Sequence, residues 1–91
     1  MAVWGLDVEQ VRQLGTQLQN KAGELEGTLS QLTTLLNNTQ WEGPDAQAFR
    51  ADWQGQHTAA LKNVINALND AGRKAQSNAA AQEQTSGNVN G

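Results

Sequence analysis

Four consecutive residues near the middle of the chain, Trp41-Glu42-Gly43-Pro44, interrupt a sequence that otherwise has a helical pattern. Gly43 has no Cβ and accepts backbone angles that other residues avoid, while the ring of Pro44 fixes φ and removes a backbone donor. The long segments on both sides carry apolar residues at helical spacing. The sequence therefore predicts a hairpin of two helices within residues 1–84, joined by a sharp turn over residues 39–43.

The composition favours an all-α fold of one small domain. The chain has 91 residues with one Pro, one Phe, no Tyr and no Cys. Abundant Ala, Leu and Gln with few β-branched residues favours helix over sheet. Because cysteine is absent, disulfides and thiol chemistry are excluded.

The first predicted helix spans residues 8–38. Asp7 is a suitable N-cap, and Gln10 completes a capping-box pattern. Apolar residues then recur every seven positions, which predicts the seam of a coiled coil. One column is Val11, Leu18, Leu25 and Leu32, and the other is Val8, Ala22, Leu29 and Leu36 with Gly15 in the gap.

The second predicted helix spans residues 44–84, with Gly43 as N-cap and Pro44 at the first helical position. Its apolar residues recur at intervals slightly wider than a heptad. Residues 85–91 are polar and contain glycine, so we expect a disordered tail. The expected stripe is Phe49, Trp53, His57, Ala60, Val64, Leu68, Ala71 and Ala75, flanked by Leu61 and Ile65.

A lone pair of such helices would leave apolar side chains in water, among them Leu14, Leu35, Leu61 and Ile65. Burying apolar area contributes about 25 cal/mol per Å². We therefore expect the hairpin to dimerise into a four-helix bundle. The residues expected to pack within the hairpin or the dimer are Val11, Leu14, Leu18, Leu25, Leu29, Leu32, Leu36, Phe49, Trp53, Ala60, Leu61, Val64 and Leu68.

Charge and hydropathy restrict the partners. The net charge of −3 disfavours nucleic acid and anionic membranes. No run approaches the ~20 apolar residues needed to span a bilayer, and the start of the chain lacks a signal-peptide pattern. By these signals we expect a cytosolic protein, unless it is exported by a route that does not read them.

Nothing in the sequence predicts catalysis. His57 is the one histidine, and we interpret it as a packed or interface residue because a triad or a metal site needs several converging groups. We expect no enzyme activity, no metal and no cofactor. Gly23 and Gly27 are either surface glycines or a close-approach site. Trp41 either caps the end of the bundle or stays partly exposed as an anchor for a partner.

With these features the chain resembles the WXG-motif family, the small ESAT-like proteins of bacterial type VII secretion. The resemblance covers nearly the whole chain: its length, the heptads of the first helix, Trp41-Glu42-Gly43, the run 45–50 and Trp53. It implies a hairpin that dimerises with itself or a sister protein. It also implies export as a folded dimer, without a cleaved signal, through a complex with an FtsK-like ATPase.

The family's export signal is a Tyr followed four residues later by Asp or Glu, read together with the partner's Trp-x-Gly turn. This chain has no Tyr, and Glu83 has Ala79 at the aromatic position. We therefore expect the signal-less member of a heterodimer, which contributes Trp41 and Gly43, with a homodimer as second choice. The alternative functions are a helical adaptor or structural module retained in the cytosol, and a membrane-active effector.

Overall fold

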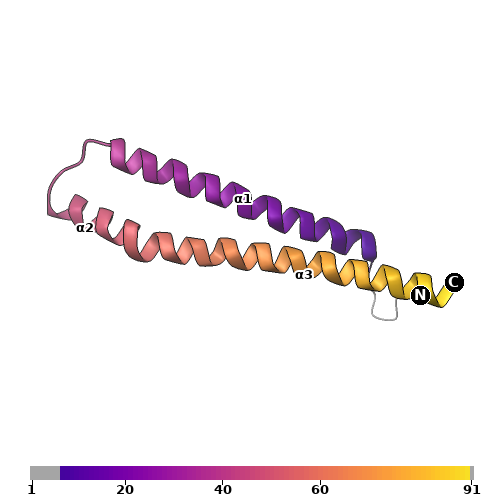
Figure 1. Ribbon diagram of the computed structural model, residues 1–91. Coiled ribbons are helices and arrows are strands. Elements are labelled where there is room, and N and C mark those ends of the chain that lie inside the picture. Colours follow the sequence, from indigo (N-terminus) through magenta and orange to yellow (C-terminus); the bar gives the residue numbers. More distant parts are fainter. Residues whose placement is uncertain (1–6, 91) are drawn as a thin grey trace.

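The protein is a long helical hairpin. The computed structural model describes the backbone of residues 7–90 and the side chains of residues 7–84. Helix α1 (Val8–Asn38) forms one arm; α2 (Pro44–Asp52), the π-helix η1 (Trp53–His57) and α3 (Thr58–Asn90) form the other. The arms run antiparallel in a rod of 69 × 17 × 16 Å (Figure 1). The predicted all-helical hairpin is confirmed.

The ends of the helices follow from local chemistry. The Asp7 side chain accepts a hydrogen bond of 3.0 Å from the backbone N–H of Gln10, so the predicted N-cap is confirmed. At the other end of α1, the Thr39 hydroxyl donates to the Leu35 carbonyl at 2.6 Å. Helix α3 continues to Asn90, past residue 84 where the sequence predicts its end, because no proline follows the strongly helical Ala79-Ala80-Ala81. Residue 91 of the predicted tail lies outside the described residues.

The two arms pack along one narrow seam. On α1 the buried residues are Gly15, Ala22 and Leu29, spaced by seven as the heptad pattern predicts. Ala22 and Leu29 pack against Ile65 of α3. Around this core lie the partly buried Leu25, Trp53, Leu61 and Leu68.

The predicted stripe of the second arm is confirmed at Trp53 and Leu68, which pack against the core, but it is wrong in phase between residues 57 and 64. Ile65 is buried and Leu61 packs against the core, whereas Val64, Phe49, Ala60 and His57 are exposed. For His57, Ala60 and Val64 the reason is η1, whose i→i+5 turn inserts one extra residue into the helix. The seam therefore contains one pair spaced by seven, Ala46 and Trp53, which ends at the first residue of η1. After η1 a second series spaced by seven follows: Thr58, Ile65, Gly72 and Ala79.

Near the turn, the residue of α1 that faces the second arm is not the one predicted from the heptad column. Leu32 is exposed, and the neighbouring Thr33 faces the second arm instead. The indole Nε1 of Trp53 donates to the Thr33 hydroxyl at 2.8 Å, which satisfies two polar groups inside a mostly apolar seam. A polar pair thus replaces the expected leucine contact.

The closest approach of the two arms is a contact between glycines. A Cβ placed on Gly15 would lie 2.8 Å from the carbonyl oxygen of Gly72, and a Cβ on Gly72 would lie 2.8 Å from the carbonyl oxygen of Gly15. Here the helices touch through their backbones, which only glycine permits. By contrast, a Cβ on Gly23 or Gly27 would meet nothing within 4 Å, so these are surface glycines.

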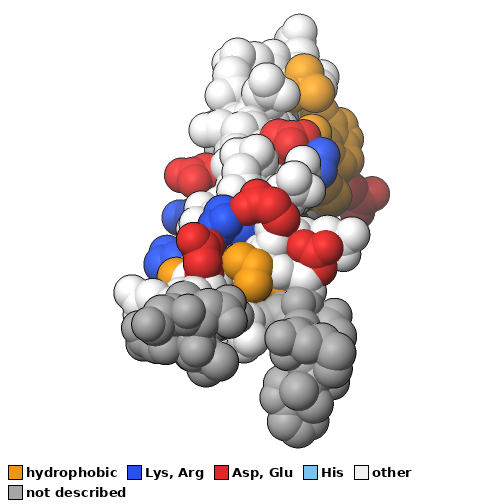
Figure 2. All heavy atoms as spheres, turned by 90° about the vertical axis from the view of Figure 1, so that its right-hand side faces the viewer, with side chains coloured by type: hydrophobic (Ala, Val, Ile, Leu, Met, Phe, Trp, Pro, Cys, Tyr) orange, Lys and Arg blue, Asp and Glu red, His pale blue; other side chains and the backbone are white. Residues whose placement is uncertain are grey.

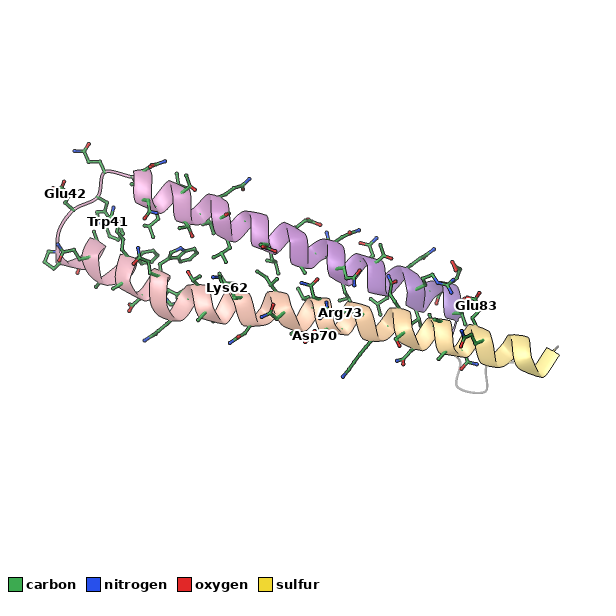
Figure 3. All side chains as sticks on the ribbon, viewed as in Figure 1. Trp41, Glu42, Lys62, Asp70, Arg73 and Glu83 are labelled. Atoms are coloured by element: carbon green, nitrogen blue, oxygen red, sulfur yellow. The ribbon has the colours of Figure 1, made fainter. Side chains whose placement is uncertain are left out.

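Polar side chains join the arms along one side of the seam. Arg12 pairs with Glu9 and, across the hairpin, with Glu83, which lies beside the start of α1 (Figure 3). Its hydrogen bonds to Glu83 and then to Glu9 raise the pKa of the Arg12 guanidinium. Gln76 donates to the Thr16 hydroxyl at 2.9 Å. Exposed pairs contribute little stability, so these contacts chiefly favour one register.

Candidate functional site

The turn between the arms depends on the backbone of Gly43. Its φ of 115° and ψ of 175° lie in a region that only glycine occupies readily. A Cβ at this position would meet nothing within 4 Å, so the requirement comes from the backbone and not from crowding. Gly43 is the N-cap of α2, its carbonyl accepts from the Gln47 N–H at 3.0 Å, and Pro44 follows it. The predicted start of the second arm is confirmed.

Substitution of Gly43 by alanine should therefore lower the free energy of unfolding by about 1–3 kcal/mol through backbone strain alone. Chemical denaturation monitored by circular dichroism measures the change. Gly23→Ala is the matched control, since that position is helical and open. Equal stability of the two variants would show that the turn does not need the positive φ.

Arg50 of α2 binds the turn through its side chain. Its guanidinium donates to the carbonyls of Trp41 at 2.8 Å, Thr39 at 3.1 Å and Leu36 at 3.4 Å. The last carbonyls of a helix lack intrahelical partners, and α1 has no basic residue in its last turn. Arg50 supplies that missing charge from the other arm. Sequence reasoning missed this residue, although the lack of a basic residue at the end of α1 was a visible signal.

Aromatic side chains form a row next to the turn. The Trp41 ring is tilted against Phe49 with centroids 5.8 Å apart, and Phe49 stacks on Trp53 at 6.4 Å. His57 completes the row, 6.5 Å from Phe49 and 6.4 Å from Trp53. Trp41 is 38% exposed and lies with Glu42 in the turn, at the opposite end from Glu83 (Figure 3). The Trp41 side chain is therefore partly open to solvent while its ring contacts Phe49.

An apolar groove of about 220 Å³ lies beside this row. Leucines at the end of α1 and aromatic rings of the second arm form its walls, and Thr39 adds one hydroxyl. Leu35, which is 63% exposed, is the most open of its leucines. The groove is lined by Leu32, Leu35, Leu36, Thr39, Phe49 and Trp53.

Further large apolar side chains are exposed on both arms, and together with those of the groove we call them the apolar flank. Its members are exposed in the hairpin, and in an end-on view hydrophobic side chains gather along one edge of the molecule (Figure 2). Elsewhere along the seam Glu26, Lys62 and Asn69 line a shared hollow together with Leu29 and Ile65. The apolar flank consists of Leu14, Leu32, Leu35, Phe49 and Val64.

The predicted packing residues divide between these two environments. The seam holds those that are buried or half-buried, and the surface holds those that are exposed in the hairpin. The seam contains Val11, Leu18, Leu25, Leu29, Leu36, Trp53, Leu61 and Leu68, whereas Leu14, Leu32, Phe49, Ala60 and Val64 face outward.

Two features are absent from the part of the chain that the structure describes. Among residues 7–84, His, Asp and Glu side chains form no group of three that could hold a metal ion. Within the described helices, none is long and apolar enough to cross a membrane.

A short two-helix hairpin with an apolar flank and a tryptophan-glycine turn defines a class of small helical interaction proteins. The chain belongs to the WXG100 family, described as proteins of 100 residues with WXG, whose family model matches residues 6–86. The resemblance seen in the sequence is thereby confirmed. Comparison with curated proteins found no match, and neither did comparison with solved structures.

This family consists of small helical, non-enzymatic proteins. It is known for small secreted effectors of type VII secretion, and its members typically pair with other WXG proteins.

Proposed function

We propose that this chain is a non-catalytic partner or effector that a type VII secretion system exports as a folded dimer. Family membership supports the secretion route. The observation that carries the proposal is the pairing of an exposed apolar flank with a partly exposed Trp41 at the turn. The flank provides a surface for a partner hairpin, and the turn provides a surface for recognition.

The partner surface follows from what the hairpin leaves unburied. Leu14, Leu35 and Val64 are about half exposed or more, at 53%, 63% and 48%. Burial of such side chains against a second hairpin removes apolar area from water and completes a four-helix bundle. The partner that we propose is a sister WXG protein in a heterodimer, with a homodimer as the alternative.

The absence of tyrosine supports the choice of a heterodimer. No Tyr occurs among these 91 residues, so we propose that the partner supplies the Tyr-based signal and that this chain contributes Trp41 and the Gly43 bend. An FtsK-like ATPase would then bind the dimer and drive export without cleavage of a signal peptide. The size of the purified chain, alone and with a sister protein, tests the pairing; a monodisperse folded dimer of the chain alone favours the homodimer.

Trp41→Ala should reduce export several-fold while it lowers the free energy of unfolding by only about 1 kcal/mol, because the ring is partly exposed and contacts chiefly Phe49. Immunoblots of culture medium and cell lysate measure export, and thermal denaturation measures stability. Trp53→Ala is the matched control. It should lower the free energy of unfolding by about 3 kcal/mol, since Trp53 packs on the core and donates to Thr33.

Equal losses of export and stability in Trp41→Ala would show that Trp41 has only a structural role. The same export assay separates the alternative functions. Full retention in the cytosol beside an active secretion system would instead favour an adaptor or structural module. Leakage of liposomes on addition of the purified chain would favour a membrane-active effector.

A further inference from the structure

We propose that Arg50 is a positioning residue that fixes Trp41 in the orientation read during export. This inference rests on the proposed role of Trp41 as part of a recognition signal. It deepens that role by assigning the residue that holds the signal in place. All three acceptors of the guanidinium are backbone carbonyls at the end of α1 or in the turn, at Leu36, Thr39 and Trp41.

The guanidinium bridges the whole connection between the arms. One nitrogen, Nη1, donates to the Trp41 carbonyl, and the other, Nη2, donates to those of Thr39 and Leu36. A planar fork with donors on both nitrogens suits this task, whereas the single ammonium of lysine cannot span all three acceptors in the same way. The positive charge also lies at the negative end of the α1 dipole. Arg50 therefore ties the exit of α1 to α2.

Two adjacent residues of α2 hold Trp41 from two sides. Arg50 binds its carbonyl at 2.8 Å, and Phe49 contacts its ring with centroids 5.8 Å apart. Helix α2 therefore contacts both the main chain and the indole ring of Trp41. When the guanidinium is removed, the ring contact with Phe49 remains, and Phe49 is itself 43% exposed.

The experiment uses the full chain with Trp4→Phe and Trp53→Phe, which leaves Trp41 as the one fluorophore of its kind. In this background Arg50→Ala should raise acrylamide quenching of Trp41 about twofold and lower its anisotropy. Arg50→Lys should give an intermediate value. In the otherwise unmodified chain, Arg50→Ala should reduce export by as large a factor as Trp41→Ala, with partial rescue by Arg50→Lys.

Two controls separate positioning from a general loss of stability. Leu68→Ala weakens the seam far from the turn, and Arg73→Ala removes an exposed guanidinium that pairs with Asp70. Both should leave the quenching of Trp41 unchanged. If Leu68→Ala raised quenching as much as Arg50→Ala, the effect would be one of stability and the proposal would be overturned.

The remaining outcomes separate this inference from the function on which it rests. Unchanged quenching in Arg50→Ala overturns the positioning role. Raised quenching with normal export, in a system where Trp41→Ala blocks export, overturns the link between position and recognition. If Trp41→Ala itself is exported normally, the proposed recognition function fails, while raised quenching in Arg50→Ala still supports Arg50 as the residue that positions Trp41.

Discussion

Alanine in place of Gly72 should force the two arms apart and lower the free energy of unfolding by about 3 kcal/mol, at the upper end for an overpacked core. The added Cβ would lie 2.8 Å from the Gly15 carbonyl oxygen and 2.7 Å from Cγ of Gln19. The glutamine side chain can rotate away, but the carbonyl belongs to the helix backbone. Relief therefore requires a shift of one whole helix against the other, which loosens the seam on both sides of the contact.

The matched control is Gly23→Ala, in the helix that carries Gly15. A Cβ at this position meets nothing within 4 Å, so the exchange should stabilise the hairpin by about 1 kcal/mol through helix propensity alone. Urea denaturation of the two variants measures both values. The same sign of change in both variants would show that the arms do not touch at Gly15 and Gly72.

The contact between these glycines shows which features of the fold the sequence could not predict. Gly15 is visible in the sequence as a gap in a heptad column, because that pattern lies within one helix. Its pairing with Gly72 depends on the register between the arms, which a long-range set of contacts determines. The Asp7 cap and the Gly43-Pro44 start of the second arm were predictable because their chemistry is confined to a few neighbouring residues.

The phase of the second arm was not predictable for a related reason. A period averaged across η1 combines two heptad series that are offset by the inserted residue. The average selected Val64 for the stripe, whereas Ile65 occupies the seam. Propensity offers little warning, since a π-turn uses the same residues as the α-helix around it. In the structure the π-turn is accompanied by a hydrogen bond from the Thr58 hydroxyl to the Trp53 carbonyl.

The candidate site shows the same division between local and long-range information. The sequence identified Trp41 and Gly43 because an aromatic residue, a glycine and a proline stand together in a helical chain. Arg50 is nine residues from Trp41 and reaches the turn only after the arms pair. The apolar flank likewise emerges only when the seam is known, because the same leucine pattern serves both surfaces.

Because the seam and the apolar flank are separate surfaces, we expect opposite effects from the same substitution at two leucines of α1. Leu29→Asp should abolish the fold, with a cost on the order of 5 kcal/mol, because Leu29 is 8% exposed and packs against Ala22 and Ile65. A carboxylate there loses the apolar contacts and has to be desolvated or protonated. Leu35→Asp makes the same chemical change at a side chain that is 63% exposed. It should keep the helical circular dichroism spectrum of the hairpin but weaken association with a second hairpin.

Circular dichroism and light scattering of both variants, with and without the sister protein, test this pair of expectations. Helical, associating Leu29→Asp protein would mean that the seam is wrongly assigned. Leu35→Asp protein that unfolds as fully as Leu29→Asp would mean that the arms cannot fold without their partner. Leu35→Asp protein that still associates with full affinity would remove Leu35 from the partner surface. The apolar flank explains binding of the second hairpin only if Leu29→Asp prevents folding and Leu35→Asp prevents association.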